Sequence, residues 1–199
     1  MITNAAGRSV PTEVNGRESV PFAGVGGHRP TGRKAAPVIT TCIDYPADGD
    51  KRVGSIREAL EHVGLADGMV VSSHHHLRNG DAVANLVFDA AADLGRRDLM
   101  WFPSASFPVH ANQLRHLDNG VIHHIEGSMN GPLGAYCSTG RMRGLGVLRS
   151  HGGRWQAIQD GEVHIDVAVI AAPTADAFGN ATGDRGPAGC GLLGFALAD

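Results

Sequence analysis

The sequence predicts an α/β fold over residues 41–199, a mainly parallel sheet flanked by helices. β-rich runs alternate with amphipathic helical stripes from residue 55 onward, and each β-rich run is followed by a loop of Gly, Pro and small polar residues. The run 165–172 is the most continuous apolar stretch of the chain, which is typical of a central strand buried on both faces. Strands and helices that alternate in this way pack as a parallel sheet covered by its crossover helices.

Residues 1–40 are predicted to be an extended arm outside this domain. They contain six Gly and four Pro with little apolar periodicity, so any helix or strand would be interrupted every few residues. Gly24, Gly26 and Gly27 do not lie between a strand and a helix, and they therefore form no dinucleotide-binding fingerprint. Composition does not decide whether the arm covers its own domain, another subunit or solvent.

The first helix is predicted over residues 56–63. Ser55 and Glu58 form a capping box at its start, and Gly64 follows its end. Its apolar residues have the spacing of one helix face: Ile56, Ala59, Leu60 and Val63. A short amphipathic helix therefore precedes the first strand.

Strand, loop and helix then follow one another repeatedly. The strand at 69–73 leads into the loop SHHHLRNG and a helical stripe at 83–94. The strand at 99–102 leads into the loop PSASFP and a helix at 111–117. A third strand at 121–125 is followed by the loop EGSMNGP. This order is that of successive parallel β-α units.

The loops that follow the predicted strands are expected to share one edge of the sheet. They are SHHHLRNGD, PSASFP, EGSMNGP and, after the run 165–172, PTADAFGNATG. In open parallel sheets ligands bind outside the carboxyl ends of the strands, where short loops and helix amino termini converge. Loops rich in Gly and small polar residues suit a ligand that carries phosphates or carbonyl oxygens.

Composition excludes several classes of protein. The 199 residues are 42% hydrophobic and 19% charged, and their net charge is −3. The chain contains no block of five or more basic residues, which argues against nucleic-acid binding. The apolar runs are far shorter than the about 18 residues of a membrane span, and no targeting segment follows Met1, so a cytoplasmic location is expected. The three cysteines form no CxxC pair and are expected to be reduced thiols: Cys42, Cys137 and Cys190.

The histidine triplet His74, His75 and His76 is not predicted to bind a metal ion. Three consecutive residues of an extended segment point to alternate sides and cannot all face one ion. We predict no metal site in this chain. At a strand end these side chains can hydrogen-bond a substrate oxygen, or they can pack and cap the turn before Asn79 and Gly80.

No serine of the chain lies in the GxSxG turn of a serine hydrolase. Ser104, Ser106, Ser128 and Ser150 are therefore interpreted as turn residues. The segment His151, Gly152 and Gly153 can present backbone N–H groups to an oxyanion, and it is equally typical of a simple Gly-Gly turn.

Two carboxylates follow predicted strands. Glu126 lies just past the strand at 121–125, the position of a possible nucleophile. Asp176 precedes Gly179 and Asn180, where the carboxylate and the amide can stabilise an Asx turn and the glycine permits close approach. Both a structural loop and a ligand contact fit this second pattern.

Several segments together resemble the amino-terminal half of citrate lyase alpha subunits. The combination of SHHHLRNGD, SHGG and ADAFGN carries the resemblance, which extends from about Gly16 to Asp199. It implies the fold that CoA-transferases share with sugar-phosphate isomerases. It also implies citrate CoA-transferase activity, in which acetyl-acyl-carrier protein and citrate give citryl-acyl-carrier protein and acetate through a glutamyl thioester on the enzyme.

The same resemblance implies a set of partners. A gamma subunit, the acyl-carrier protein, bears the CoA-like phosphoribosyl-dephospho-CoA prosthetic group. A beta subunit cleaves the citryl thioester to oxaloacetate with the help of a magnesium ion. Citrate and acetate are the small-molecule ligands that the family exchanges.

Residue by residue, the resemblance places the candidate binding site in these loops. Residues 73–80 occupy the place of a glycine-rich loop near the thioester, but this chain has histidines there, which gives His74 or His75 a possible role on citrate carboxylates. Asp176, Gly179 and Asn180 match the family's ADxxGN motif. The full candidate set is Ser73, His74, His75, Asn79, Gly80, Ser104, Ser106, His151, Gly152, Gly153, Asp176, Gly179 and Asn180.

The family's nucleophilic glutamate lies in a carboxyl-terminal half beyond the position of Asp199, so no catalytic residue is assigned in this chain. We expect a second polypeptide to supply that half, or the chain to be a fragment. The fold is also compatible with another CoA-transferase, a sugar-phosphate isomerase-like protein, a module that only binds a phosphorylated metabolite or CoA, or a scaffold subunit.

Overall fold

The computed structural model describes residues 1–14, 16–21, 49–77 and 79–190. The chain divides into two compact units, Met1–Lys34 and Ala35–Asp199. The predicted boundary at residue 40 and Cys42 lie outside the described residues.

The described residues of the first unit form two small antiparallel hairpins. Strand β1 (Ile2–Thr3) pairs with β2 (Ser9–Val10), and β3 (Glu13–Val14) pairs with β4 (Arg17–Glu18). The side chain of Asn4 accepts hydrogen bonds from the backbone N–H groups of Ala6 and Arg8, both at 3.0 Å, and so reverses the chain. Residues 1–14 and 16–21 of the predicted extended arm form short hairpins, because Gly and Asn make turns between short strands, and residues 22–40 of it lie outside the described residues.

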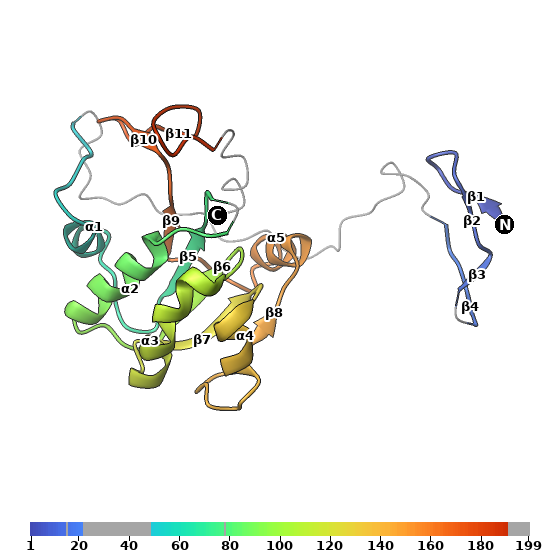
Figure 1. Ribbon diagram of the computed structural model, residues 1–199, viewed down its shortest axis with the longest axis horizontal. Helices are drawn as coiled ribbons and strands as arrows, with labels where there is room; N and C mark the ends of the chain where they lie inside the picture. Colours follow the sequence, from blue (N-terminus) through green and yellow to red (C-terminus); the bar gives the residue numbers. More distant parts are fainter. Residues whose placement is uncertain (15, 22–48, 78, 191–199) are drawn as a thin grey trace. The chain divides into compact units, whose positions relative to one another are not determined.

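The second unit is built on a five-stranded parallel sheet with strand order β8-β7-β6-β5-β9 (Figure 1). Its strands are β5 (Val70–His74), β6 (Leu99–Pro103), β7 (Ile122–Gly127), β8 (Val147–Leu148) and β9 (Val167–Ile170). All four pairings within the sheet are parallel. The predicted fold class, a parallel sheet with flanking helices, is confirmed.

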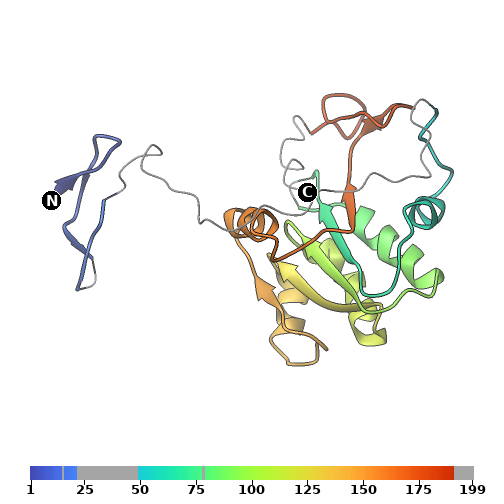
Figure 2. The ribbon, with the colours of Figure 1, turned by 180° about the vertical axis from the view of Figure 1, so that it is seen from behind.

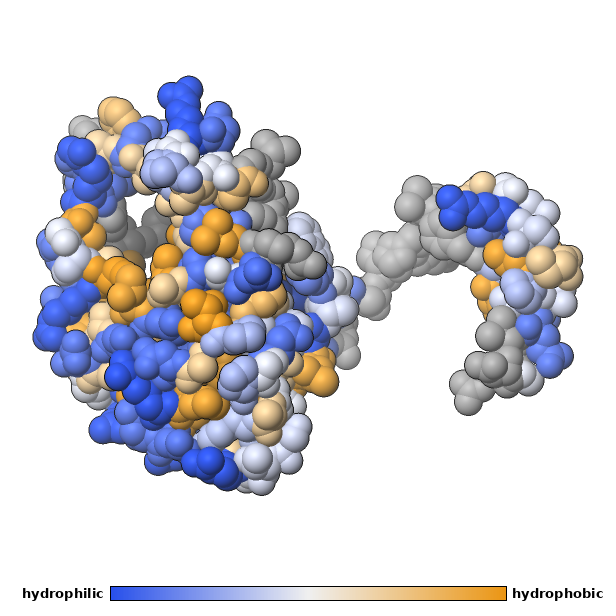
Figure 3. All heavy atoms as spheres, viewed as in Figure 1, coloured by the Kyte–Doolittle hydropathy of each residue, from blue (hydrophilic) through white to orange (hydrophobic). Residues whose placement is uncertain are grey.

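Helices cover both faces of the sheet (Figures 1 and 2). One face packs against α1 (Ile56–His62), α2 (Val83–Asp93), α3 (Gln113–Asn119) and α4 (Gly131–Cys137), around a core that includes Phe88 and Trp101. Hydrophilic side chains gather over the outer surface of α2 and α3 (Figure 3). The remaining helical elements of the described residues are η2 (Pro108–Asn112), which precedes α3, and α5 (His151–Gln159) on the opposite face.

The other face has a smaller core beneath α5. Met100 and Phe102 of β6 pack there against Ala157 of the helix and Val163 of the segment that follows it. Because side chains alternate along a strand, β6 sends Leu99 and Trp101 to one core and Met100 and Phe102 to the other. All five residues of β6 are buried, so it is the central strand.

The prediction that the run 165–172 forms the central strand is wrong. Its strand, β9, lies at an edge of the sheet and pairs only with β5 within the sheet. Val167 is buried, but Ala168 and Ile170 are exposed. A continuous apolar run predicts burial but does not determine the place of the strand in the sheet, and at this edge of the described sheet alternate residues of β9 are exposed.

The capping residues predicted at the helix ends are confirmed, except that the carboxylate of Glu58 has a different backbone partner. Ser55 Oγ accepts a hydrogen bond from Glu58 N at 3.1 Å, as predicted for the start of α1. The carboxylate of Glu58 reaches one residue further back than a capping box requires, to Gly54 N at 2.8 Å. Gly120, in the left-handed conformation, ends α3.

Two helices, α4 and α5, were not predicted from the sequence. Their sequences, GPLGAYC and HGGRWQAIQ, contain glycines that disfavour an isolated helix. Burial of Leu133 in α4 and of Arg154 and Ala157 in α5 holds them against the sheet. Tertiary packing stabilises these helices where propensity does not.

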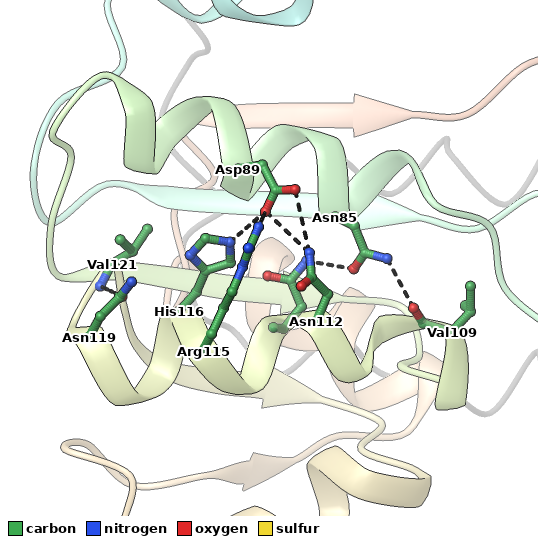
Figure 4. A network of polar contacts seen from close by, with 9 residues as sticks. Asn85, Asp89, Val109, Asn112, Arg115, His116, Asn119 and Val121 are labelled. Atoms are coloured by element: carbon green, nitrogen blue, oxygen red, sulfur yellow. Dashed lines mark hydrogen bonds and ion pairs between the residues drawn. The ribbon is translucent and has the colours of Figure 1, made fainter.

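A polar network joins α2 to α3 (Figure 4). The carboxylate of Asp89 accepts hydrogen bonds from His116 Nε2 at 2.7 Å, from Asn112 Nδ2 at 3.2 Å and from Arg115. Burial opposes ionisation of Asp89, but the bonds from His116 and Arg115 outweigh it and hold the pKa of the carboxyl below its usual value. The network therefore depends on a charged Asp89.

We expect Asp89→Asn to lower the free energy of unfolding by about 1 kcal/mol at pH 7, because a partly exposed carboxylate loses three charge-assisted or polar contacts. The folded-state pKa is below the unfolded value, so this contribution is present at neutral pH and is lost as the pH falls below about 4. Urea unfolding at pH 7 and pH 3 measures it. Asp93→Asn, an exposed carboxylate on the same helix, is the control. An equal loss at both pH values would contradict the prediction.

Candidate functional site

The loops after β5, β6 and β7 lie side by side at the carboxyl edge of the sheet. Ser104 N, just after β6, donates to Ser73 O of β5 at 3.0 Å. Ser106 N donates to Ser128 O, just after β7, at 2.7 Å. The parallel pairing brings these segments together, so the predicted convergence of these three loops is confirmed.

The serines of this edge hold the loops to one another. Ser106 is fully buried, and its Oγ accepts from Asn130 N at 3.1 Å while its carbonyl accepts from Asn130 Nδ2 at 3.0 Å. Ser73 Oγ accepts from the indole N–H of Trp101 at 2.8 Å. Ser104 is also buried. Their structural contacts agree with the interpretation of Ser104 and Ser106 as turn residues.

The three histidines have different partners, so they do not all face one point, as predicted. His74 is 5% exposed and lies 3.5 Å from the guanidinium of Arg154. His75 Nδ1 bonds to Leu77 O at 2.7 Å, and its ring packs edge-on against Phe107 at 4.6 Å between centroids. His76 Nδ1 lies 3.0 Å from the carboxylate of Asp81.

Gly80 allows the loop after β5 to touch the loop after β6. Its φ is +86°, and a Cβ there would lie 2.9 Å from the side chain of Val109 and 3.1 Å from that of Phe107. His110 binds both loops: its Nδ1 accepts from Phe107 N at 3.0 Å and its Nε2 donates to Asp81 O at 2.9 Å. Burial lowers the pKa of His110, which favours this neutral form. Asn79, beside Gly80, is exposed.

His151, Gly152 and Gly153 form the first turn of α5, not a free Gly-Gly turn. Ser150 is the N-cap, and its Oγ accepts from Gly153 N at 3.0 Å. Arg149 N donates to Gly127 O, at the end of β7, which places the start of α5 at the carboxyl edge of the sheet. A Cβ on Gly152 would meet no atom within 4 Å, so space remains beside this turn.

Sequence reasoning missed Arg154, a buried cation beneath this edge. The residue is 3% exposed, and its Nη2 donates to Ser72 Oγ at 2.7 Å. Its guanidinium lies 4.1 Å from the centre of the Phe102 ring. Recognising α5 from its N-cap Ser150 would have predicted a helix, and the i, i+3 spacing would have placed Arg154 on the same face as the apolar Ala157.

The loop after β9 forms a separate hairpin between β10 (Thr174–Ala175) and β11 (Ala181–Thr182). Asp176 Oδ1 accepts from the backbone N–H groups of Phe178 and Asn180, both at 2.9 Å, and Asn180 Nδ2 donates to Oδ2 at 2.9 Å. The Asn180 side chain is the main cause of the lowered pKa of Asp176. The predicted Asx turn is confirmed, with Gly179 at φ +86° inside it.

The hairpin loop also contacts the segment that precedes α1. Lys51 N donates to Ala177 O at 2.7 Å, and a Cβ on Gly179 would lie 3.3 Å from the Lys51 side chain. The side chains of Asp176 and Asn180 form hydrogen bonds largely with each other and with the backbone of their own turn. Their position as ligand contacts stays a prediction.

Glu126 lies inside β7, not past its end, which corrects its predicted position. Its carboxylate accepts from Arg149 Nε at 2.8 Å and lies 3.7 Å from His124 Nε2. Burial lowers the pKa of His124, against the attraction of Glu126. A carboxylate held by a cation is less available as a nucleophile than the sequence position suggested.

Within the described ranges, no group of three or more His, Cys, Asp or Glu side chains is arranged to hold a metal ion. The same residues contain no helix with both the length and the apolar character needed to cross a bilayer.

Comparisons with known proteins agree with one another. A family model described as citrate lyase, alpha subunit (CitF), matches residues 49–199. The citrate lyase alpha chain of Klebsiella pneumoniae is 43% identical over 146 residues, which cover 73% of this chain and 29% of that protein. The corresponding chain of Escherichia coli K12 is 41% identical over 150 residues, 75% of this chain and 29% of its own length.

A solved structure shows the same relationship. A crystal structure from Streptococcus mutans, of an alpha subunit of citrate lyase in complex with citrate, superposes with a TM-score of 0.73 and 39% identity, covering 98% of this chain and 38% of that one. This chain therefore spans about a third of the length of the relatives it matches. It belongs to the citrate lyase alpha subunit family.

Proposed function

We propose that this chain provides the amino-terminal domain of a citrate CoA-transferase, which exchanges acetyl for citryl on the thioester of an acyl-carrier protein. The observation that carries the proposal is the 39% identity to the Streptococcus mutans citrate complex across 98% of this chain. The gamma and beta subunits of a citrate lyase complex are the proposed partners, and a cytoplasmic location belongs to the same proposal. The nucleophilic glutamate is assigned to a second, carboxyl-terminal half.

The electrostatics of the carboxyl edge suit a ligand with several carboxylates. Arg154 places a buried positive charge directly beneath the end of β5, in contact with His74. Leu77 O can only accept, so His75 Nδ1 carries the proton in that bond and Nε2 is the ring atom left to face a ligand. We assign a citrate carboxylate to His75 in its doubly protonated form, in which Nε2 also donates, with Arg154 and His74 supporting it electrostatically.

Replacing His74 and His75 together by Ala is expected to weaken citrate binding at least about tenfold, through loss of a hydrogen bond to a charged group. Titration calorimetry of the chain with citrate measures the change. His164→Ala, at the amino end of β9 and so at the opposite edge of the sheet, is the matched control. Unchanged citrate affinity in the double variant would show that neither histidine contributes to citrate binding.

The start of α5 fits the CoA-like prosthetic group that the carrier subunit would bring. Helix amino termini with small residues favour phosphate, and Gly152 leaves open space at this turn. When bound, the group supplies the thioester that accepts the citryl unit. The chain's own contribution here is to place backbone N–H groups and Ser150 at the edge where citrate is proposed to bind.

Gly152→Ala separates binding from folding. Ala favours a helix over Gly by up to about 1 kcal/mol, and the new methyl meets no atom within 4 Å, so stability is expected to be unchanged or higher. If the prosthetic group packs closely on this turn, affinity for dephospho-CoA falls about tenfold, as measured by titration calorimetry. If the folded variant bound dephospho-CoA with unchanged affinity, the result would contradict binding of the prosthetic group at α5.

A further inference from the structure

Three sulfur atoms meet beside α4. Met129 precedes the helix, Cys137 is its last residue, and Met142 lies in the loop that follows. The Sγ of Cys137 is 3.2 Å from the Sδ of Met129 and 3.9 Å from the Sδ of Met142. One thiol and two thioethers therefore share a single small volume.

The sulfur cluster, Met129, Cys137 and Met142, borders an open pocket. The pocket has a volume of about 340 Å³, and Cys137, Met142 and Gly146 are among the residues that line it. A Cβ on Gly146 would lie 3.0 Å from the methyl of Met142 and 3.4 Å from that of Met129. A glycine at this position therefore leaves room for both thioether side chains near Cys137, and of the two methionines Met142 lines the pocket.

The arginines near the pocket are paired with carboxylates, so they oppose a bound cation less strongly. Arg141 donates to Asp118 at 2.7 Å, and Arg143, which lines the pocket, lies 3.9 Å from Asp98. Each guanidinium thus faces a carboxylate. These pairs reduce the repulsion that an incoming positive ion would meet.

We propose that Met129, Cys137 and Met142 form a binding site for one soft monovalent metal ion, Cu(I). Thiolate and thioether ligands select Cu(I) over harder ions. Sulfur ligands about 2.3 Å from one ion in a trigonal arrangement lie about 4 Å apart, close to the 3.9 Å between Cys137 and Met142. The flexible side chain of Met129 can open its shorter distance by rotation.

The charge balance favours a monovalent ion. The Sγ of Cys137 is the donor toward the Sδ of Met129 at 3.2 Å, so the thiol carries its proton when the site is empty. Binding breaks the S–H bond, forms a Cu–S bond and releases one proton to solvent. One thiolate with one Cu(I) gives a neutral centre, which a half-buried site accommodates better than a charged one.

The test uses the full chain with Cys42→Ser and Cys190→Ser, so that Cys137 is the remaining thiol. Anaerobic titration with Cu(I) held by bicinchoninate is expected to show one ion bound per chain and one proton released per ion. Ag(I), a soft monovalent ion without redox chemistry, is expected to compete. Failure of the chain to remove Cu(I) from the chelator would overturn the proposal.

A second variant distinguishes a three-sulfur site from a reactive thiol. Met129→Leu combined with Met142→Leu keeps side-chain volume but removes both thioethers. Affinity for Cu(I) is expected to fall at least about 100-fold while the urea unfolding midpoint stays close to that of the parent. Equal affinity in a folded double variant would show binding by the thiol alone and refute the site.

Discussion

The 199-residue polypeptide, purified by itself, is expected to exchange acetyl for citryl at less than about one thousandth of the rate of a complete alpha subunit, because loss of a covalent nucleophile costs about 10³-fold or more. The proposed function assigns the nucleophilic glutamate to a part of the alpha subunit beyond Asp199. Glu126, the carboxylate that sequence position favoured within this chain, is held by Arg149 at 2.8 Å. Transfer from acetyl-loaded carrier protein to citrate, with the Klebsiella pneumoniae alpha chain as reference, measures the difference.

Addition of the carboxyl-terminal portion of a relative is expected to restore transfer and to produce a covalent thioester adduct that mass spectrometry detects. A module that only binds CoA or a metabolite would form no such adduct. Glu126→Gln is expected to leave the restored rate unchanged. Transfer at a normal rate by the chain alone, lost in the Gln variant, would instead identify Glu126 as the nucleophile.

Trp101→Ala is expected to lower the free energy of unfolding by about 3 to 5 kcal/mol, a large part of the 5 to 15 kcal/mol of a typical domain. Trp101 is fully buried in the central strand and packs edge-on against Phe88 and His110, with ring centroids at 5.7 and 5.6 Å. The substitution also removes the N–H that binds Ser73 Oγ. Urea unfolding followed by circular dichroism measures the loss.

Two further variants separate the contributions of Trp101. Trp155→Ala, 44% exposed on α5, controls for loss of an indole outside the core and is expected to cost less than about 1 kcal/mol. Trp101→Phe keeps most of the buried volume but leaves the Ser73 hydroxyl without its donor, with an expected cost of about 1 to 3 kcal/mol. Equal losses for Trp101→Ala and Trp155→Ala would contradict the assignment of β6 as the central strand.

Much of the fold could be predicted because its signals are local. The cap at Ser55, the stripe of α2 and the left-handed Gly120 each specify an element through residues within a few positions of one another. The helices α4 and α5 escaped prediction because their glycine-rich sequences have weak intrinsic preference for a helix. They depend on contacts with a sheet that the sequence pattern alone does not place.

The candidate site, like the fold, could be predicted where its signals are local and was missed where it depends on distant contacts. The geometry of an extended segment correctly predicted that His74, His75 and His76 do not all face one point, and Asx chemistry predicted the turn at Asp176. Arg154 was missed because it reaches His74 from 80 positions away in the sequence. The ligand contacts of the candidate residues stay predictions that the experiments above address.

The amino-acid sequence by itself determined the alternation of strands and helices, the parallel sheet and the edge where the loops after β5, β6 and β7 meet, because periodicity, caps and chain direction are encoded within short segments. Only the tertiary structure decided that β6 is central and β9 lies at an edge, that Arg154 lies under His74, and that three sulfur atoms meet beside α4. The physical reason is that side-chain packing joins distant segments, and the identity of each partner depends on how the whole sheet is ordered.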